Sequence, residues 1–259
     1  MVVPQAANCP DPEQWLELIA QQQVTIWNSA PALLELVVNY LIGFGQQLPP
    51  SLRLILLSGD RINPNLVVQL QNLNPQLQIV SLGGATEASI WSICYPITQT
   101  WSAEKTIPYG RPLHNQSFYI LDPQQQLVPI GITGELYIGG VGVARGYLHR
   151  PELTASKFIA NPFLKQISLN NEGKEDRLYK TGDLGRYFPD GNIEFLGRID
   201  NQVKIRGVRI ELGEIEATLL QCPEIQETIV TVNSSSPDHS SLIAYLILKP
   251  NSTLTTQQL

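Results

Sequence analysis

The chain has 259 residues, of which 43% are hydrophobic and 15% charged, a composition typical of a folded globular protein. Its net charge of −6 at pH 7 argues against a general binder of nucleic acids or anionic membranes, because both attract basic proteins. The three cysteines are far apart, and we find neither a secretory signal nor a bilayer-spanning apolar run, so we expect a cytoplasmic protein.

Residues 11–84 alternate between helical and strand patterns. Asp11 is expected to cap a first helix that has Pro12 at its first position. The other patterns predict strands at residues 24–27, 53–57 and 77–82, and helices at residues 31–41 and from residue 64. This βαβαβ order predicts a parallel sheet covered by helices, in which ligands bind beyond the carboxyl ends of the strands.

Beyond Trp91 the strands become shorter and turns more frequent, which predicts a β-rich layer. The expected elements are strands at 118–121 and 134–138, a hairpin closed by residues 189–191, surface loops at 165–177 and 233–239, and an apolar strand at 242–248.

Residues 197–216, GRIDNQVKIRGVRIELGEIE, predict a strand at 202–205, a break at Gly207 and a helix at 211–220 with acidic residues in its first turn. We place a boundary near Asp200, after which a portion of about sixty residues is small for an independent core.

Two short motifs contain residues suited to binding a nucleotide. GGATE at 83–87 follows a predicted strand and is expected to open a helix. Its backbone N–H groups and the Thr86 hydroxyl can face an anion, and the Glu87 carboxylate can hold Mg²⁺ together with phosphate. In YKTGDL at 179–184, the Asp183 carboxylate can accept two hydrogen bonds, which suits the paired hydroxyls of a ribose. A capped strand-to-helix turn and a turn-forming aspartate are the simpler explanations for either motif alone.

Four motifs occur in a fixed order: GGATEASI at 83–90, GELYIGGVGVARGY at 134–147, YKTGDL at 179–184, and the segment 197–216. In this order they resemble the motif series of the adenylate-forming superfamily, specifically the amino-acid adenylation domains of nonribosomal peptide synthetases. The resemblance implies an α/β fold, with a parallel sheet under helices and a β-rich layer. Residues 1–199 would be the C-terminal part of the large AMP-binding domain, and residues 200–259 the truncated start of a small, mobile α+β domain.

The resemblance also implies the reaction and its participants. Such a domain uses ATP and Mg²⁺ to convert an amino acid into an aminoacyl adenylate, and then transfers it to the phosphopantetheine thiol of a peptidyl carrier protein. Thr86 would contact phosphate, Glu87 the metal and Asp183 the ribose, and Asp200 would be the hinge. The implied catalytic residues are Thr86, Glu87 and Lys204, and the implied nucleotide-binding residues are Ser81, Gly84, Thr86, Asp183, Phe195, Arg198 and Lys204.

One departure from the family concerns the adenine. The family usually has a tyrosine, whose ring stacks on adenine, at the position of Gly83. Adenine stacking by that residue is therefore not expected in this chain.

The positions that line the family's amino-acid pocket align here with Asn28, Leu56, Ser58, Leu82, Ile90 and Trp91. As a set they resemble the pocket of cysteine-activating domains, which occur beside heterocyclisation domains. An apolar pocket with one hydroxyl and Trp91 as its floor suits a short thiol side chain, so we expect cysteine as the substrate and allow a heterocyclisation domain as a second protein partner. Ordinary packing is the alternative for Leu56, Leu82 and Ile90.

The family's glycine- and serine-rich phosphate loop, its early substrate-binding aspartate and its C-terminal lysine are not found in the sequence. We therefore expect an internal fragment that is nearly inactive by itself. An acyl-CoA or aryl-acid ligase of the same superfamily, and a non-catalytic remnant, are the alternatives.

Overall fold

The computed structural model describes residues 1–4, 10–163, 177–200, 202–205, 207–233 and 241–250, and for Lys204 the backbone alone. The chain divides into two compact units, Met1–Ile199 and Asp200–Leu259. The division falls at Asp200, the residue expected to be the hinge.

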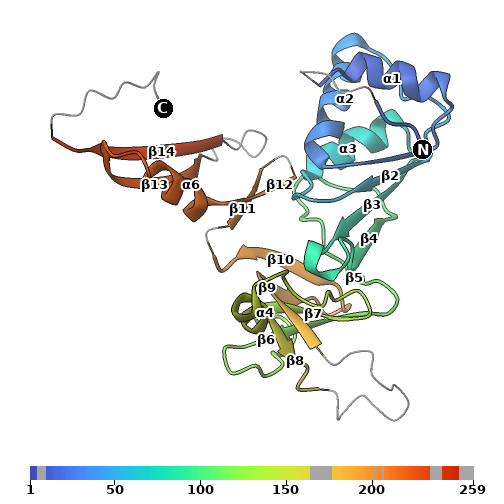
Figure 1. Cartoon of the computed structure of the whole chain (residues 1–259). Helices are drawn as coiled ribbons and strands as arrows, with labels where there is room; N and C mark the ends of the chain where they lie inside the picture. The colour runs from blue at the N-terminus through green and yellow to red at the C-terminus, as the bar shows by residue number, and fades with distance from the viewer. Residues whose placement is uncertain (5–9, 164–176, 201, 206, 234–240, 251–259) are drawn as a thin grey trace. The chain divides into compact units, whose positions relative to one another are not determined.

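The first unit begins with a five-stranded sheet in the order β1-β2-β3-β4-β5 (Figure 1). Its parallel strands are β1 (Ile26–Ser29), β2 (Leu54–Leu57) and β3 (Gln78–Gly83), and its antiparallel strands are β4 (Ile93–Ile97) and β5 (Arg111–Pro112). The predicted parallel sheet is confirmed. β1 begins at Ile26 rather than at residue 24, so Asn28 lies within the strand and not beyond its end.

Three helices, α1 (Pro12–Gln21), α2 (Pro31–Phe44) and α3 (Pro64–Leu73), share a hydrophobic core with β2 and β3. Each begins with proline, whose missing N–H is not needed in the first turn. The Asp11 side chain accepts a hydrogen bond from the Gln14 N–H (3.1 Å) and so caps α1 as predicted. Asn63 caps α3 in the same way, by accepting from the Asn65 N–H (3.0 Å).

The β-rich layer is an antiparallel sheet in the order β10-β9-β7-β6, with β8 also paired to β9 (Figure 1). Its elements are β6 (Gln116–Leu121), β7 (Gly134–Gly140), α4 (Pro151–Lys157), β8 (Phe158–Ala160), β9 (Arg177–Tyr187) and β10 (Ile193–Arg198). The predicted β9–β10 hairpin is present, and its turn is closed by a hydrogen bond from the Gly191 N–H to the Phe188 carbonyl (2.9 Å). The predicted loop at 165–177 lies outside the described residues apart from Arg177, which begins β9.

The second unit contains two hairpins and a helix. β11 (Gln202–Ile205) pairs with β12 (Val208–Glu211), α6 (Leu212–Leu219) follows, and β13 (Ile225–Asn233) pairs with β14 (Ser241–Leu248). Glu216 Oε1 in α6 accepts a hydrogen bond from the Val230 N–H of β13 (2.8 Å). The predicted strands at 202–205 and 242–248 and the helix after Gly207 are confirmed; the predicted loop at 233–239 falls outside the described residues except for Asn233.

Candidate functional site

The first three strands bring four of the predicted pocket residues to one face of the sheet. Asn28 lies opposite Leu56 in the β1–β2 register, and Leu56 lies opposite Val80 of β3. Because successive side chains of a strand point to alternate faces, Ser58 shares the face of Leu56, and Leu82 shares the face of Val80. These side chains are exposed or half-buried, whereas Ile55, Leu57 and Ile79 on the opposite face are buried in the core shared with the helices.

The remaining pocket candidates, Ile90 and Trp91, lie in the turn that follows GGATE. The expected helix is a single 3₁₀ turn, η1 (Thr86–Ala88), because Ser89 and Ile90 adopt left-handed φ angles of 62° and 69°. Ile90 is 66% exposed, so it lies in the open. Trp91 is half-buried, and its Nε1 is buried without a hydrogen-bond partner among the described residues.

Glu87, the candidate metal ligand, is held by Tyr147. The Glu87 side chain is buried, and its Oε1 accepts a hydrogen bond of 2.6 Å from the Tyr147 hydroxyl. The Ala144 N–H also donates to the Glu87 carbonyl (2.8 Å), and the Ser89 hydroxyl donates to the Gly142 carbonyl (2.8 Å). The GGVGVARGY motif therefore packs along GGATE and fixes its carboxylate.

The Tyr147 hydroxyl acts as a donor to this carboxylate. Burial raises the pKa of Tyr147 far above its usual value, and the hydrogen bond to Glu87 raises this pKa further. The phenol is therefore protonated at neutral pH and donates. The sequence analysis did not assign this role to Tyr147, because Glu87 and Tyr147 are far apart in the chain.

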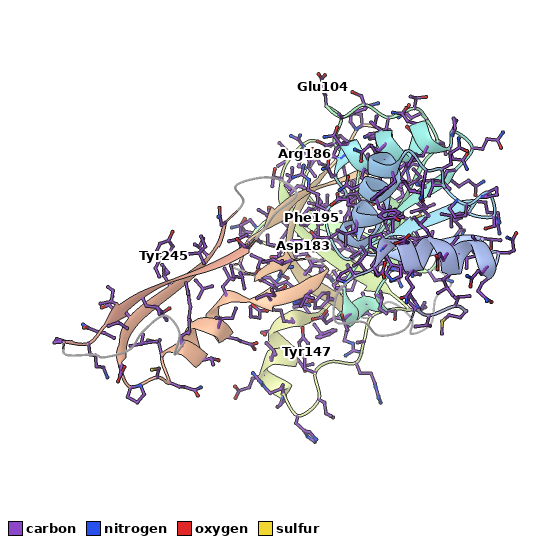
Figure 2. All side chains as sticks on the ribbon, turned by 90° about the horizontal axis from the view of Figure 1, so that it is seen from above. Glu104, Tyr147, Asp183, Arg186, Phe195 and Tyr245 are labelled. Carbon is purple, nitrogen blue, oxygen red and sulfur yellow. The ribbon has the colours of Figure 1, made fainter. Side chains whose placement is uncertain are left out.

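Asp183, the candidate ribose ligand, forms an ion pair with Arg198. The two residues lie opposite each other in the β9–β10 register, and Arg198 Nη1 is 2.5 Å from Asp183 Oδ1. Each side chain is 13% exposed. Arg198 Nη2 also donates to the Thr181 carbonyl (3.1 Å), which anchors the guanidinium. Figure 2 shows Asp183 and Phe195 near one another on this hairpin.

Tyr109 connects the GGATE segment with the β9–β10 hairpin, although no sequence motif pointed to it. A Cβ atom on Gly83 would lie 1.9 Å from Cε2 of the Tyr109 ring, so the ring packs directly on this glycine. The Phe195 ring is 5.7 Å away between centroids. Burial and the Asp183 carboxylate raise the Tyr109 pKa, while the Gly84 backbone and the Arg198 guanidinium lower it.

The other nucleotide candidates are placed as follows. Thr86 is exposed in η1, and Ser81 is buried on the same face of β3 as Gly83, opposite to the face of Leu82. Lys204 belongs to the second unit, where its backbone pairs with Arg209 in the β11–β12 hairpin.

Glu87 is the candidate for holding Mg²⁺. Among the described residues, no group of three or more His, Cys, Asp and Glu side chains could hold a metal ion. Mg²⁺ that is bound together with nucleotide phosphates takes only one or two carboxylates, so the buried, oriented Glu87 fits this ion.

Residues 1–148 match the family of AMP-binding enzymes. The chain belongs to this family. It is 43% identical over 240 residues to pyochelin synthetase PchF of Pseudomonas aeruginosa, and 45% identical over 232 residues to bacitracin synthase 1 of Bacillus licheniformis. These alignments include 93% and 89% of this chain, but only 13% and 4% of the relatives, so the chain spans a small part of their length.

Solved structures show the same fold. NpsA-ThdA, an artificially fused adenylation–PCP di-domain from Klebsiella oxytoca, matches 97% of this chain with a TM-score of 0.79 and 28% identity, over 44% of its own length. The synthetase FmoA3 with bound α-methyl-L-serine-AMP matches 82% of this chain with a TM-score of 0.67 and 38% identity, over 23% of its own length. The AMP-binding domain is therefore of the adenylation type found in nonribosomal peptide synthetases.

Among the residues that the structure describes, no helix is long and apolar enough to cross a membrane.

Proposed function

We propose that this chain provides the adenylate- and amino-acid-binding surface of a domain that activates an amino acid with ATP. The observation that carries the proposal is the arrangement at the end of β3. Leu82 of the pocket face directly precedes Gly83, on which the Tyr109 ring packs. Tyr109 in turn packs against Phe195 of the β9–β10 hairpin, which also carries Asp183. An amino acid and a nucleotide bound at these groups would meet at one strand end, as joining them requires.

In the proposed reaction the amino-acid carboxylate attacks the α-phosphorus of ATP. A new P–O bond forms, the bond to the bridging oxygen of the β-phosphate breaks, and pyrophosphate leaves. Asp183 accepts hydrogen bonds from ribose hydroxyls, and Arg198 holds its carboxylate in place. Glu87 binds Mg²⁺, which neutralises charge on the phosphates, and Tyr147 orients Glu87.

The amino acid is proposed to be cysteine. The pocket face combines the Ser58 hydroxyl and the Asn28 amide with the apolar Leu56 and Leu82, and the half-buried Trp91 follows η1. A pocket of this kind favours a short, weakly polar side chain and excludes large ones. The support from relatives is general: FmoA3 is a synthetase solved with an aminoacyl adenylate in place.

The acceptor of the activated amino acid is proposed to be the phosphopantetheine thiol of a carrier protein. Lys204 of the second unit is proposed to contribute to catalysis, and Asp200 to act as the hinge of the small mobile domain. NpsA-ThdA and PA1221 both combine an adenylation with a carrier domain, which supports this partner. A heterocyclisation domain is a further proposed neighbour.

Calorimetric titration with non-hydrolysable aminoacyl sulfamoyladenosines tests the proposal directly. The chain should bind the cysteinyl compound at least about tenfold more tightly than the phenylalanyl compound, because Trp91 limits the pocket. Asp183→Asn should weaken both compounds by a similar factor, since it acts on the ribose. Equal binding of both compounds would exclude the pocket assignment, and no binding of either would contradict the proposed function.

A further inference from the structure

The Tyr109 ring occupies the space that a side chain at position 83 would otherwise fill. Cε2, Cζ and Cδ2 of the ring would lie 1.9, 2.6 and 2.8 Å from a Cβ atom on Gly83. Contacts this short are not possible, so glycine at position 83 and the ring at position 109 depend on each other.

The backbone around Tyr109 is held from two sides. The Tyr109 N–H donates to the Ile193 carbonyl of β10 (2.8 Å), and the Ile193 N–H donates to the Gly110 carbonyl (2.8 Å). On the other side, a Cβ atom on Gly110 would lie 1.9 Å from the Cys94 carbonyl oxygen of β4, so this residue must be glycine. Tyr109 is thus fixed where the two sheets of the first unit meet.

The ring itself is held in one orientation. Phe118 meets its edge at 6.2 Å between centroids with an interplanar angle of 89°, and Phe195 packs against it at 5.7 Å and 51°. Tyr109 as a whole is half-buried, although its hydroxyl end is enclosed, so the residue lies at the edge of the core and not inside it.

We propose that Tyr109, from the segment before β5, provides the aromatic surface on which the base of the bound nucleotide packs. The inference rests on the proposed function. It follows from position: the Tyr109 ring packs on Gly83, which precedes Gly84 of the proposed phosphate turn, and on Phe195 of the β9–β10 hairpin, which also carries the proposed ribose ligand Asp183. A base is joined to its ribose by one bond and so must lie close to the ribose ligand, and nucleobases stack well on tyrosine and phenylalanine rings.

Comparing AMP with ribose 5-phosphate isolates the contribution of the base. In NMR titrations of the 259-residue chain, Tyr109→Leu should lower the affinity for AMP by about 5- to 100-fold, the usual value of one base-stacking contact. It should leave the affinity for ribose 5-phosphate unchanged, because that ligand has no base. Tyr109→Phe, which keeps the ring, should retain most of the AMP affinity.

Tyr119→Leu is the matched control, because it removes a buried tyrosine ring from a separate cluster, where the ring stacks on Phe163 at 5.1 Å. Tyr119→Leu should not change the ratio of the affinity for AMP to the affinity for ribose 5-phosphate. If Tyr109→Leu weakens both ligands equally, or neither, Tyr109 only fills space and the inference is wrong. If the unmodified chain binds neither ligand, the proposed function fails as well.

A double-mutant cycle measured by thermal unfolding tests, without any ligand, whether the Tyr109 ring fills the space beside Gly83. Gly83→Ala should lower the melting temperature of the wild-type chain, because its methyl group collides with the ring. The same substitution should cost much less in a Tyr109→Ala background, where the space is open. Equal costs in the two backgrounds would show that the ring does not occupy this volume.

Discussion

At the scale of single residues, the Tyr147–Glu87 hydrogen bond makes the strongest prediction. The acceptor is a buried carboxylate and the O···O distance is 2.6 Å, so the bond belongs to the strong, charge-assisted class. The two residues come from separate motifs, and the bond holds one motif against the other. Tyr147 is thus a positioning residue for the proposed metal ligand.

Tyr147→Phe should lower the free energy of unfolding by about 1.5–3 kcal/mol, because it leaves a buried carboxylate without this donor. Glu87→Gln in the Tyr147→Phe background should cost less than it does alone. Urea unfolding of the two single variants and the double variant measures this coupling. Strict additivity of the three values would show that the hydrogen bond contributes nothing to stability.

Ile90 is in the left-handed region, which is unfavourable for a β-branched residue. It is also 66% exposed, so little packing is lost when it is replaced. Ile90→Asn should therefore stabilise the chain by about 0.5–1 kcal/mol in urea unfolding, since asparagine tolerates this conformation. Ile130→Asn is the control, because Ile130 is 63% exposed and is not among the residues with positive φ. An equal gain in both variants would exclude relief of backbone strain.

At the scale of elements, local patterns predicted the helices and the parallel sheet. The N-caps Asp11 and Asn63, each followed by proline, marked two helix starts, and alternation with apolar strands predicted the parallel order. The predicted start of β1 was wrong: the strand begins at Ile26 and not at residue 24. Its bounds are set by its pairing with β2, which the pattern of one strand does not reveal.

The candidate site was predictable only in part, because its contacts are long-range. GGATE and YKTGDL contain recognisable residue types, so Glu87 and Asp183 could be selected from the sequence. Tyr109 could not be selected from the sequence, since its proposed role depends on the pairing of β4 with β3 and of Gly110 with Ile193. The helix expected after GGATE is a single turn, because Ile90 has a left-handed φ angle that ends it. Isoleucine rarely adopts this φ, so the sequence did not indicate that the helix would stop there.

At the scale of the whole molecule, every described residue of the proposed nucleotide site except Lys204 belongs to Met1–Ile199. A shortened chain of residues 1–199 should therefore still unfold cooperatively and bind AMP with nearly unchanged affinity. Circular dichroism melting and AMP titration check this. Loss of AMP binding in a shortened chain that still folds would place an essential nucleotide contact in the second unit.

The most direct test of the central claim is amino-acid-dependent exchange of radiolabelled pyrophosphate into ATP. Because the relatives are much longer than this chain, it is best measured on the chain extended by the remaining parts of an adenylation domain. Cysteine should support the fastest exchange, and Asp183→Ala should lower the exchange rate by at least about tenfold. Exchange that depends on fatty or aryl acids, and not on any amino acid, would contradict the proposed function.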